Sequence, residues 1–375
     1  MNSKRTISFI IILLAGLIHS CTQVYEPPAV QVKTNFLVVE GIINSGQDST
    51  IITLSRTKSI TDTSFTTIPE LNANVFIEEE GGSSYPLSPL GTGQYGTAAV
   101  ILNSNKRYRL RIQAAGNFYS SDYVPVKQTP PIDSLSWAQP DDLTFYVDTH
   151  DPNNATRYYR WEYDETWEYQ TPYESFYVFE NNHIRDRDSN ELVHTCYRFA
   201  NSNDIILGTS SQLSEDIITH IPLLTIPRNS RKLSVKYSLN VKQYALTEEA
   251  LKYWQLLKKN TQQLGTLFDA QPSQLTGNIH SESDPTEPVI GYVSVSSIQA
   301  KRIFVTTFTL NNWHAPPEII CTNIIVPRDS ATFYLSLDPT IGIAYAVTGG
   351  FALSKHECYD CTLLGGTNKK PSYWP

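Results

Sequence analysis

Cys21 carries the most specific chemistry in the sequence. It follows two basic residues and an apolar run from Ile7 to Ile18, which together have the layout of an export signal. The run is shorter than the roughly 20 apolar residues that span a bilayer. The small residue Ser20 stands directly before the cysteine. The pattern therefore predicts that residues 1–20 are removed and that Cys21 is acylated, with palmitate among the attached fatty acids. An ordinary signal peptide with an incidental cysteine is the alternative.

Four further cysteines are candidates for disulfide bonds: Cys196, Cys321, Cys358 and Cys361. An even number of thiols in an oxidising compartment favours two bonds, for which three connectivities exist. The connectivity that we favour joins Cys358 to Cys361. A zinc site that combines these two cysteines with His356 is the alternative, although it lacks a fourth ligand.

Residues 91–96 have the sequence Gly-Thr-Gly-Gln-Tyr-Gly, which has the spacing of a dinucleotide-binding fingerprint. That motif needs a helix directly after it, because the helix start faces the pyrophosphate. Since Thr97 to Leu102 is predicted to be a strand, we interpret these glycines as a β-turn.

Asp186, Asp188 and Asn190 alternate like the first ligands of a calcium-binding loop. However, Glu191 and Tyr197 stand where such a loop requires a glycine and a bidentate glutamate. We therefore predict a solvated polar loop, with a calcium site as the alternative.

Common catalytic motifs do not occur in the sequence, which lacks His-Glu-x-x-His, Gly-x-Ser-x-Gly and the phosphate-binding loop. We accordingly expect neither catalytic activity nor a cofactor. Because catalytic groups can be far apart in sequence, a hydrolase built from residues such as Asp148, His150 and Asp151 is an alternative hypothesis.

Aromatic residues are concentrated between Tyr158 and Phe179. In the first half they alternate with charged residues, as in a strand that buries one face. The second half continues beyond what one buried strand needs, and rigid aromatic rings supply contact area at low entropic cost. A role in core packing and a role in binding are both possible for this half. Four of its residues form a candidate binding surface: Trp167, Tyr169, Tyr173 and Tyr177.

The composition predicts a mainly β protein. Of the 375 residues, 40% are hydrophobic and 18% are charged, which is typical of a globular chain. The 22 Tyr and 22 Pro against one Met favour strands and turns over helices. A net charge of -8 argues against nucleic acid as a partner, because binding to phosphate backbones requires clustered cations.

The mature chain divides into two predicted domains. After a lipidated tether over residues 21–33, residues 34–126 have the short strands and turns of an immunoglobulin-like β-sandwich. A proline pair then marks a boundary, and residues 127–375 are predicted to form a larger β-rich domain. The main strands predicted in the first domain are Asn35 to Glu40, Thr50 to Ser55, Asn74 to Glu80, Arg107 to Gln113 and Phe118 to Val124.

One helical insertion is predicted in the second domain, near residues 247–264. Thr247 can cap its first turn, and Glu248 and Glu249 suit the positive end of the helix dipole. The last strands are predicted from Thr332 to Ala346.

Several segments of the mature chain carry a resemblance to one family. They include Leu37-Val-Val-Glu-Gly41, Tyr237-Ser-Leu239, Tyr253-Trp254, Pro272-Ser-Gln-Leu-Thr-Gly-Asn-Ile279, Gly291-Tyr292 and Cys358-Tyr-Asp-Cys361. On these residues the chain resembles the outer-membrane lipoproteins of Bacteroidota grouped as domain-of-unknown-function family 4249. It departs from the family near its end, where Leu364 replaces an expected basic residue.

The resemblance implies a lipid-anchored outer-membrane protein from a family without an established enzymatic activity. It also implies association with a TonB-dependent transporter, at whose mouth the protein would capture or cover a small-molecule or peptide cargo. The cell surface is the expected location, and the periplasmic face of the membrane is the alternative. A structural or adhesive envelope protein is a third hypothesis.

Overall fold

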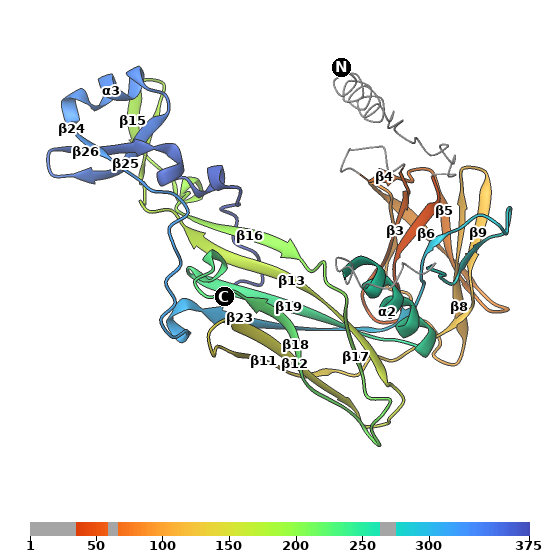
Figure 1. Cartoon of the computed structure of the whole chain (residues 1–375). Helices are drawn as coiled ribbons and strands as arrows, with labels where there is room; N and C mark the ends of the chain where they lie inside the picture. Colours follow the sequence, from red (N-terminus) through yellow and green to blue (C-terminus); the bar gives the residue numbers. More distant parts are fainter. Residues whose placement is uncertain (1–34, 59–66, 263–274) are drawn as a thin grey trace, which may run out of the picture.

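The computed structural model describes residues 35–58, 67–262 and 275–375. These residues form three units, which are a barrel-like sheet, a two-sheet sandwich and a smaller distal unit (Figure 1). The predicted mainly β fold is confirmed. The predicted signal peptide, the tether and Cys21 lie outside the described residues. Within the described ranges, no helix is long and apolar enough to cross a membrane.

The barrel-like sheet contains the five strands predicted from local sequence patterns. Its strands are β1 (Leu37–Gly41), β3 (Thr50–Arg56), β4 (Ile68–Pro69), β5 (Asn74–Glu79), β6 (Ser84–Gly91), β7 (Gln94–Thr97), β8 (Arg107–Ala114), β9 (Asn117–Ser121), β10 (Val124–Pro125), β20 (Ile279–Ser281) and β21 (Ile290–Gly291). They follow the order β20-β9-β8-β5-β6-β7-β3-β1-β21, with β10 beside β8 and β4 beside β3. Alternation places Tyr108, Leu110 and Ile112 of β8 in the core.

Strand β6 connects the two halves of the sheet, which curve around one apolar core. Its first half pairs with β5 and its second half pairs with β7. One nearly closed sheet therefore surrounds the apolar side chains, and the predicted immunoglobulin-like arrangement is not confirmed. The predicted β-turn is present between β6 and β7, where Gly91 and Gly93 have positive φ angles. The strand predicted from Thr97 to Leu102 is wrong, because β7 ends at Thr97.

The sheet also recruits a segment from far along the chain. β21 lies parallel to β1, and β20 pairs with β9. In addition, β22 (Val295–Ser296) lies parallel to β2 (Ile43–Asn44). These late strands come from residues predicted to belong to the second domain, so residues 34–126 do not build the sheet alone.

A two-sheet sandwich occupies the middle of the chain. One sheet has the order β11-β12-β18, and the other has the order β16-β13-β19-β23 with β17 beside β13. The bounds are β11 (Ile132–Ala138), β12 (Leu143–Asp151), β13 (Tyr158–Gln170), β16 (Thr195–Asn201), β17 (Ile206–Thr209), β18 (Asp216–Ile226), β19 (Lys236–Ala245) and β23 (Ile298–Thr306). The sheets pack through aromatic side chains such as Phe145 and Tyr237, whose ring centroids are 5.5 Å apart. Trp161 is fully buried between them.

Helix α2 (Glu248–Gln262) lies between the sandwich and the barrel-like sheet (Figure 1). It begins as predicted, because the Thr247 hydroxyl accepts a hydrogen bond from the Ala250 N–H at 3.2 Å. Ala250 and Leu251 are buried, which fixes the helix on the sandwich side. The end of the predicted helix, residues 263 and 264, lies outside the described residues.

The distal unit is built from a two-stranded sheet, a three-stranded sheet and one helix. Its elements are β14 (Tyr177–Glu180), β15 (His183–Asp186), β24 (Ile324–Pro327), α3 (Ala331–Leu337), β25 (Ile341–Val347) and β26 (Gly350–Lys355). The prediction of strands from Thr332 is wrong for the residues of α3. Short 3-10 helices occur at η1 (Ser189–Glu191), η2 (Arg231–Leu233), η3 (Thr307–Thr309), η4 (Arg328–Ser330), η5 (His356–Cys358) and η6 (Cys361–Leu364).

The four remaining cysteines form two disulfides, but not in the predicted pairing. Cys196 is bonded to Cys361, and Cys321 is bonded to Cys358. Cys358 does not pair with Cys361, because Cys358 in η5 lies against Cys321, whereas Cys361 in η6 lies against Cys196 of β16. The zinc alternative is also wrong, since both of its thiols are in disulfides.

Candidate functional site

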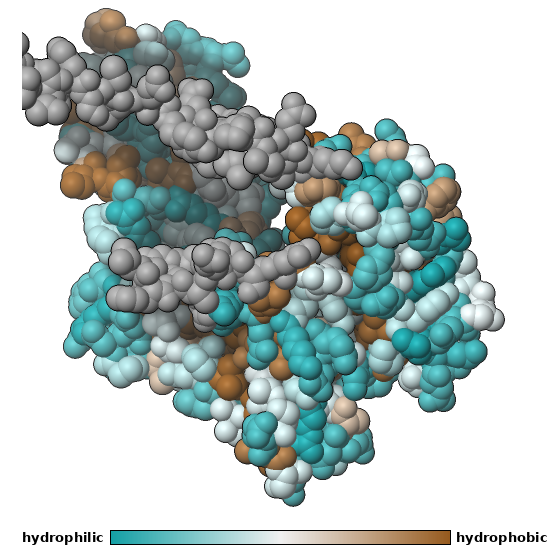
Figure 2. Space-filling view, turned by 45° about the vertical axis from the view of Figure 1, so that its right-hand side comes forward, coloured by the Kyte–Doolittle hydropathy of each residue, from teal (hydrophilic) through white to brown (hydrophobic). Residues whose placement is uncertain are grey.

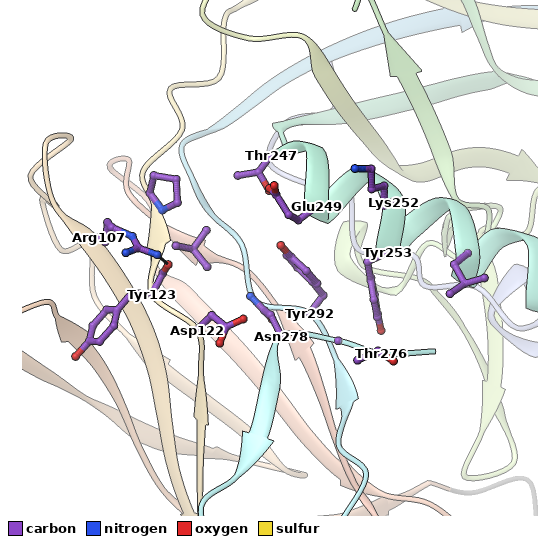
Figure 3. Close-up of a pocket in the computed structure, with 14 residues that line it drawn as sticks. Arg107, Asp122, Tyr123, Thr247, Glu249, Lys252, Tyr253, Thr276, Asn278 and Tyr292 are labelled. Atoms are coloured by element: carbon purple, nitrogen blue, oxygen red, sulfur yellow. Dashed lines mark hydrogen bonds between the residues drawn. The ribbon is translucent and has the colours of Figure 1, made fainter. Parts of the chain in front are cut away.

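A pocket of about 800 Å³ lies between the start of α2 and one end of the barrel-like sheet. We call it the junction pocket (Figure 3). Residues 122–125, the first turns of α2, residues 276–278 and Tyr292 line it. These segments are distant in sequence, so the pocket exists only because the late strands return to the barrel.

The barrel side of the pocket is fixed where the two edges of the sheet meet. The Asn278 side chain donates to the Val293 carbonyl at 2.9 Å and accepts from the Val293 N–H at 2.8 Å. A Cβ atom at Gly277 would lie 1.8 Å from the carbonyl oxygen of Gly291. Only glycine permits this approach, so the backbone on this side has little freedom to move.

The helix side of the pocket presents the first turn of α2. The backbone N–H of Glu249 and the Thr247 hydroxyl hold the pKa of the Glu249 carboxyl below its usual range. This carboxylate is therefore charged at neutral pH. One turn on, Lys252 forms an ion pair with Glu248 at 2.6 Å.

Charges of both signs surround the junction pocket. Asp122 and Glu249 supply carboxylates, and Arg107 and Lys252 supply cations from opposite sides (Figure 3). Arg107 is oriented by donating to the backbone carbonyl of Tyr123.

Two tyrosines form the inner part of the pocket. The rings of Tyr253 on α2 and Tyr292 have centroids 5.2 Å apart. Burial raises the pKa of Tyr253 to about 12 and also raises the pKa of Tyr292. Both phenols are therefore neutral hydroxyl groups at physiological pH, and they can donate or accept a hydrogen bond.

A second pocket, of about 580 Å³, is also lined by these two tyrosines. We call it the apolar pocket, because residues of β1, β21 and α2 give it a mainly aliphatic and aromatic lining. One wall carries Arg160, whose guanidinium lies 3.9 Å from the Trp254 ring centroid and 4.9 Å from that of Tyr244. Arg160 also pairs with Glu162 at 2.5 Å. Together the two pockets can accommodate a ligand with an apolar body and charged groups.

The predicted binding surface is divided among several packing sites. Tyr169 is 4% exposed, and its hydroxyl donates to the Cys361 carbonyl at 2.6 Å. Trp167 is partly buried, and the Lys232 ammonium lies 5.1 Å from its ring centroid. These two residues help to join the sandwich to the C-terminal segment.

The other two residues of that predicted surface contact the distal unit. The Tyr173 ring centroid lies 5.3 Å from that of Tyr345. Tyr177 is packed edge-on against Phe351 at 5.2 Å. All four predicted residues are thus buried or partly buried, and the structure does not gather them on one exposed face.

The residues of the hydrolase hypothesis lie on one strand but form separate contacts. Asp148 accepts a hydrogen bond from Ser134, whereas His150 pairs with Asp133 at 2.7 Å. The Asp133 carboxylate raises the pKa of His150. Asp151 is buried and accepts hydrogen bonds from backbone N–H groups of the following turn. These residues therefore do not form a catalytic triad, in which a nucleophile is hydrogen-bonded to a base and the base to an orienting acid.

The predicted polar loop is organised by an ion pair. Glu191 accepts from Arg185 at 2.7 Å and from the Asp188 N–H at 2.9 Å. Arg185 lowers the pKa of Glu191 to about 2. Across the described parts of the chain, no three His, Cys, Asp or Glu side chains are grouped to hold a metal ion.

Sequence reasoning missed both pockets, because none of the residues singled out for chemistry lines them. The signal was present in the segments that carry the family resemblance. Tyr253-Trp254, Gly277-Asn278 and Gly291-Tyr292 all meet around the two pockets. The spacing of these residues matches no known chemical motif, so it does not by itself indicate a binding site.

One family model matches the sequence. It describes a Domain of unknown function (DUF4249) and covers residues 22–302. The matched range contains the barrel-like sheet and nearly all of the sandwich, whereas β24 to β26 and the C-terminal cysteines lie beyond it. No curated protein matches the sequence.

Proposed function

The chain belongs to the Domain of unknown function (DUF4249) family, and we propose that it is a non-catalytic outer-membrane lipoprotein that assists a TonB-dependent transporter. In this proposal, acyl chains on Cys21 hold the protein to the membrane. The export signal and the cysteine after Ser20 support the anchor. The protein captures or covers a cargo molecule for uptake.

The observation that carries the cargo-binding part is the pair of pockets around Tyr253 and Tyr292. A binding protein needs a concave site with an apolar surface and a few oriented polar groups. The apolar pocket supplies the apolar surface, and the charged groups of the junction pocket supply the oriented polar groups. This combination favours a small amphipathic or zwitterionic cargo, such as a short peptide, over a uniformly charged polymer.

The anchor and the partnership can be tested in cells that make the neighbouring transporter. Metabolic labelling with an alkyne analogue of palmitate should mark the wild-type protein and not Cys21→Ser. The wild-type protein should also co-purify with the transporter from detergent-solubilised outer membranes. Recovery of the lipidated chain without any transporter would contradict the proposed partnership.

The cargo site can be tested on the same purified complex. Native mass spectrometry should detect a bound small molecule or peptide, and Tyr292→Ala should lose it. The matched control is Phe308→Ala, because Phe308 is 100% exposed on the sandwich and lines neither pocket. Equal occupancy in both variants would remove the two pockets as the cargo site.

A further inference from the structure

The distal unit exposes an apolar helix face. Phe333, Tyr334 and Leu337 of α3 are 61%, 40% and 65% exposed, while Ala331 and Leu335 of the same helix are buried. We call the three exposed side chains the apolar tip. A surface helix of a soluble domain normally has a polar outer face, and the outer face of α3 departs from this pattern with three neighbouring apolar side chains.

The chemistry of the apolar tip suits a lipid surface. Residues 330–337 contain no charged side chain, and the nearest charges are Asp329 and Asp338. Phenylalanine and leucine partition into the boundary between headgroups and acyl chains, where tyrosine is also favoured. The Phe333 and Tyr334 rings pack edge-on at 5.7 Å, which gives the helix a bulky aromatic surface.

The position of the tip is consistent with that surface. The first described residue, Asn35, is bonded through its N–H to the Thr57 carbonyl, next to β4. Figure 1 places β4 and α3 at the same side of the molecule, above the sandwich, and Figure 2 shows hydrophobic atoms at the top of the distal unit. The fourteen peptide units between Cys21 and Asn35 can extend over at most about 50 Å, so a lipid on Cys21 would keep this end of the barrel within that distance of the bilayer.

We propose that the apolar tip inserts into the outer layer of the membrane to which Cys21 is anchored, as a second membrane contact. This inference rests on the anchor of the proposed function. Two contacts, at the start of the barrel and on the distal unit, fix the orientation of the protein with the sandwich away from the bilayer. Insertion of apolar side chains needs no anionic lipid, in keeping with the acidic net charge of the chain.

The test replaces the natural lipid anchor with an artificial one. A negative result then concerns the apolar tip and not the lipidation of Cys21. The mature chain with Cys21→Ser is held on phosphatidylcholine vesicles by an N-terminal histidine tag and a nickel-chelating lipid. The other four cysteines are in disulfides, so an introduced cysteine is the single free thiol. Leu337→Cys carries an environment-sensitive fluorophore, and Phe308→Cys is the matched exposed control.

The fluorophore at residue 337 should shift to shorter wavelength on the vesicles and be quenched by lipids brominated near the headgroup end of the acyl chain. The fluorophore at residue 308 should do neither. Adding Phe333→Ser should abolish most of the shift at residue 337, without changing the near-ultraviolet circular dichroism. An unchanged spectrum at residue 337 would overturn the inference, as would protection of this residue only when the purified transporter is added.

Discussion

The barrel-like sheet and the distal unit achieve their folds in opposite ways. The barrel surrounds 21 buried apolar residues, whereas the distal core contains six. No strand of the barrel contains a cysteine, while both disulfides hold segments at or beside the distal unit. A small unit buries too little apolar surface to offset its conformational entropy, and cross-links reduce that entropy in the unfolded chain.

The two regions also differ in what joins their distant segments. In the barrel, the late strands β20 and β21 are held by main-chain pairing and by the Asn278 side chain. In the distal unit, Cys321 is linked to Cys358 across 37 residues. Close backbone packing is therefore sufficient for long-range closure around the large core of the barrel, whereas the small core of the distal unit is closed by a covalent bond.

The largest expected effect comes from removing the covalent closure. The double variant Cys321→Ser and Cys358→Ser should lower the free energy of unfolding of the distal unit by about 4 kcal/mol, the loop-entropy value for this length. Hydrogen exchange should accelerate in β24 to β26 and stay unchanged in β3 and β8. Equal acceleration in both regions would mean that the disulfide stabilises the whole chain and not the distal unit.

The second effect tests the packed joint of the barrel. Gly277→Ala should cost about 3 kcal/mol, because the new Cβ would overlap the Gly291 carbonyl and force the backbone apart. The control is Gly349→Ala in the distal unit, which has φ +79° but open space around it and should cost only about 1 kcal/mol. Urea unfolding of both variants gives the comparison, and similar losses would contradict the role assigned to the joint.

Local patterns in the sequence were sufficient for much of the barrel and for α2. The alternation of Tyr108, Leu110 and Ile112 with arginines identifies β8, and Thr247 correctly marks the helix start. These predictions succeed because each depends on neighbours within a few residues.

The missed features all depend on distant partners. β20 is three residues long and gains its role from pairing with β9. Cys361 bonds a residue 165 positions away, which spacing cannot indicate. The α3 sequence Ala-Thr-Phe-Tyr-Leu-Ser-Leu has strand-like composition, whereas the helix that it forms buries Ala331 and Leu335 in the distal core. The two pockets were missed for the same reason, since they form where three distant segments meet.

A third, smaller effect isolates hydrogen bonding at the barrel joint. Asn278→Ala leaves the Val293 N–H and carbonyl without their side-chain partners and should cost about 2 kcal/mol. Asn74→Ala is the control, because its bond to Gln113 is exposed and should contribute less than about 0.5 kcal/mol. Thermal unfolding followed by circular dichroism measures both, and a larger loss for Asn74→Ala would contradict the assignment.

The smallest effect is a pH dependence confined to the edge of the distal unit. Arg185 lowers the pKa of Glu191 to about 2 from an ordinary value of 4.5. The ionised pair therefore stabilises the fold fully above about pH 4.5, and this contribution is lost as the pH falls through about 2. Both side chains are more than a third open to solvent, so solvent screening should keep the effect on global stability small.

The Glu191 titration can be followed directly through the chemical shift of its side-chain carboxyl carbon. Arg185→Gln should raise the Glu191 pKa towards 4.5, because it removes the charge that stabilises the carboxylate. Lys106→Gln on the barrel is the control, since Lys106 pairs with Glu79 at 3.4 Å and is far from Glu191 in the fold, and it should leave that titration unchanged. If Arg185→Gln also left it unchanged, other groups, such as the Asp188 N–H, would hold the Glu191 pKa low, and the ion pair would not be what holds this loop against β15.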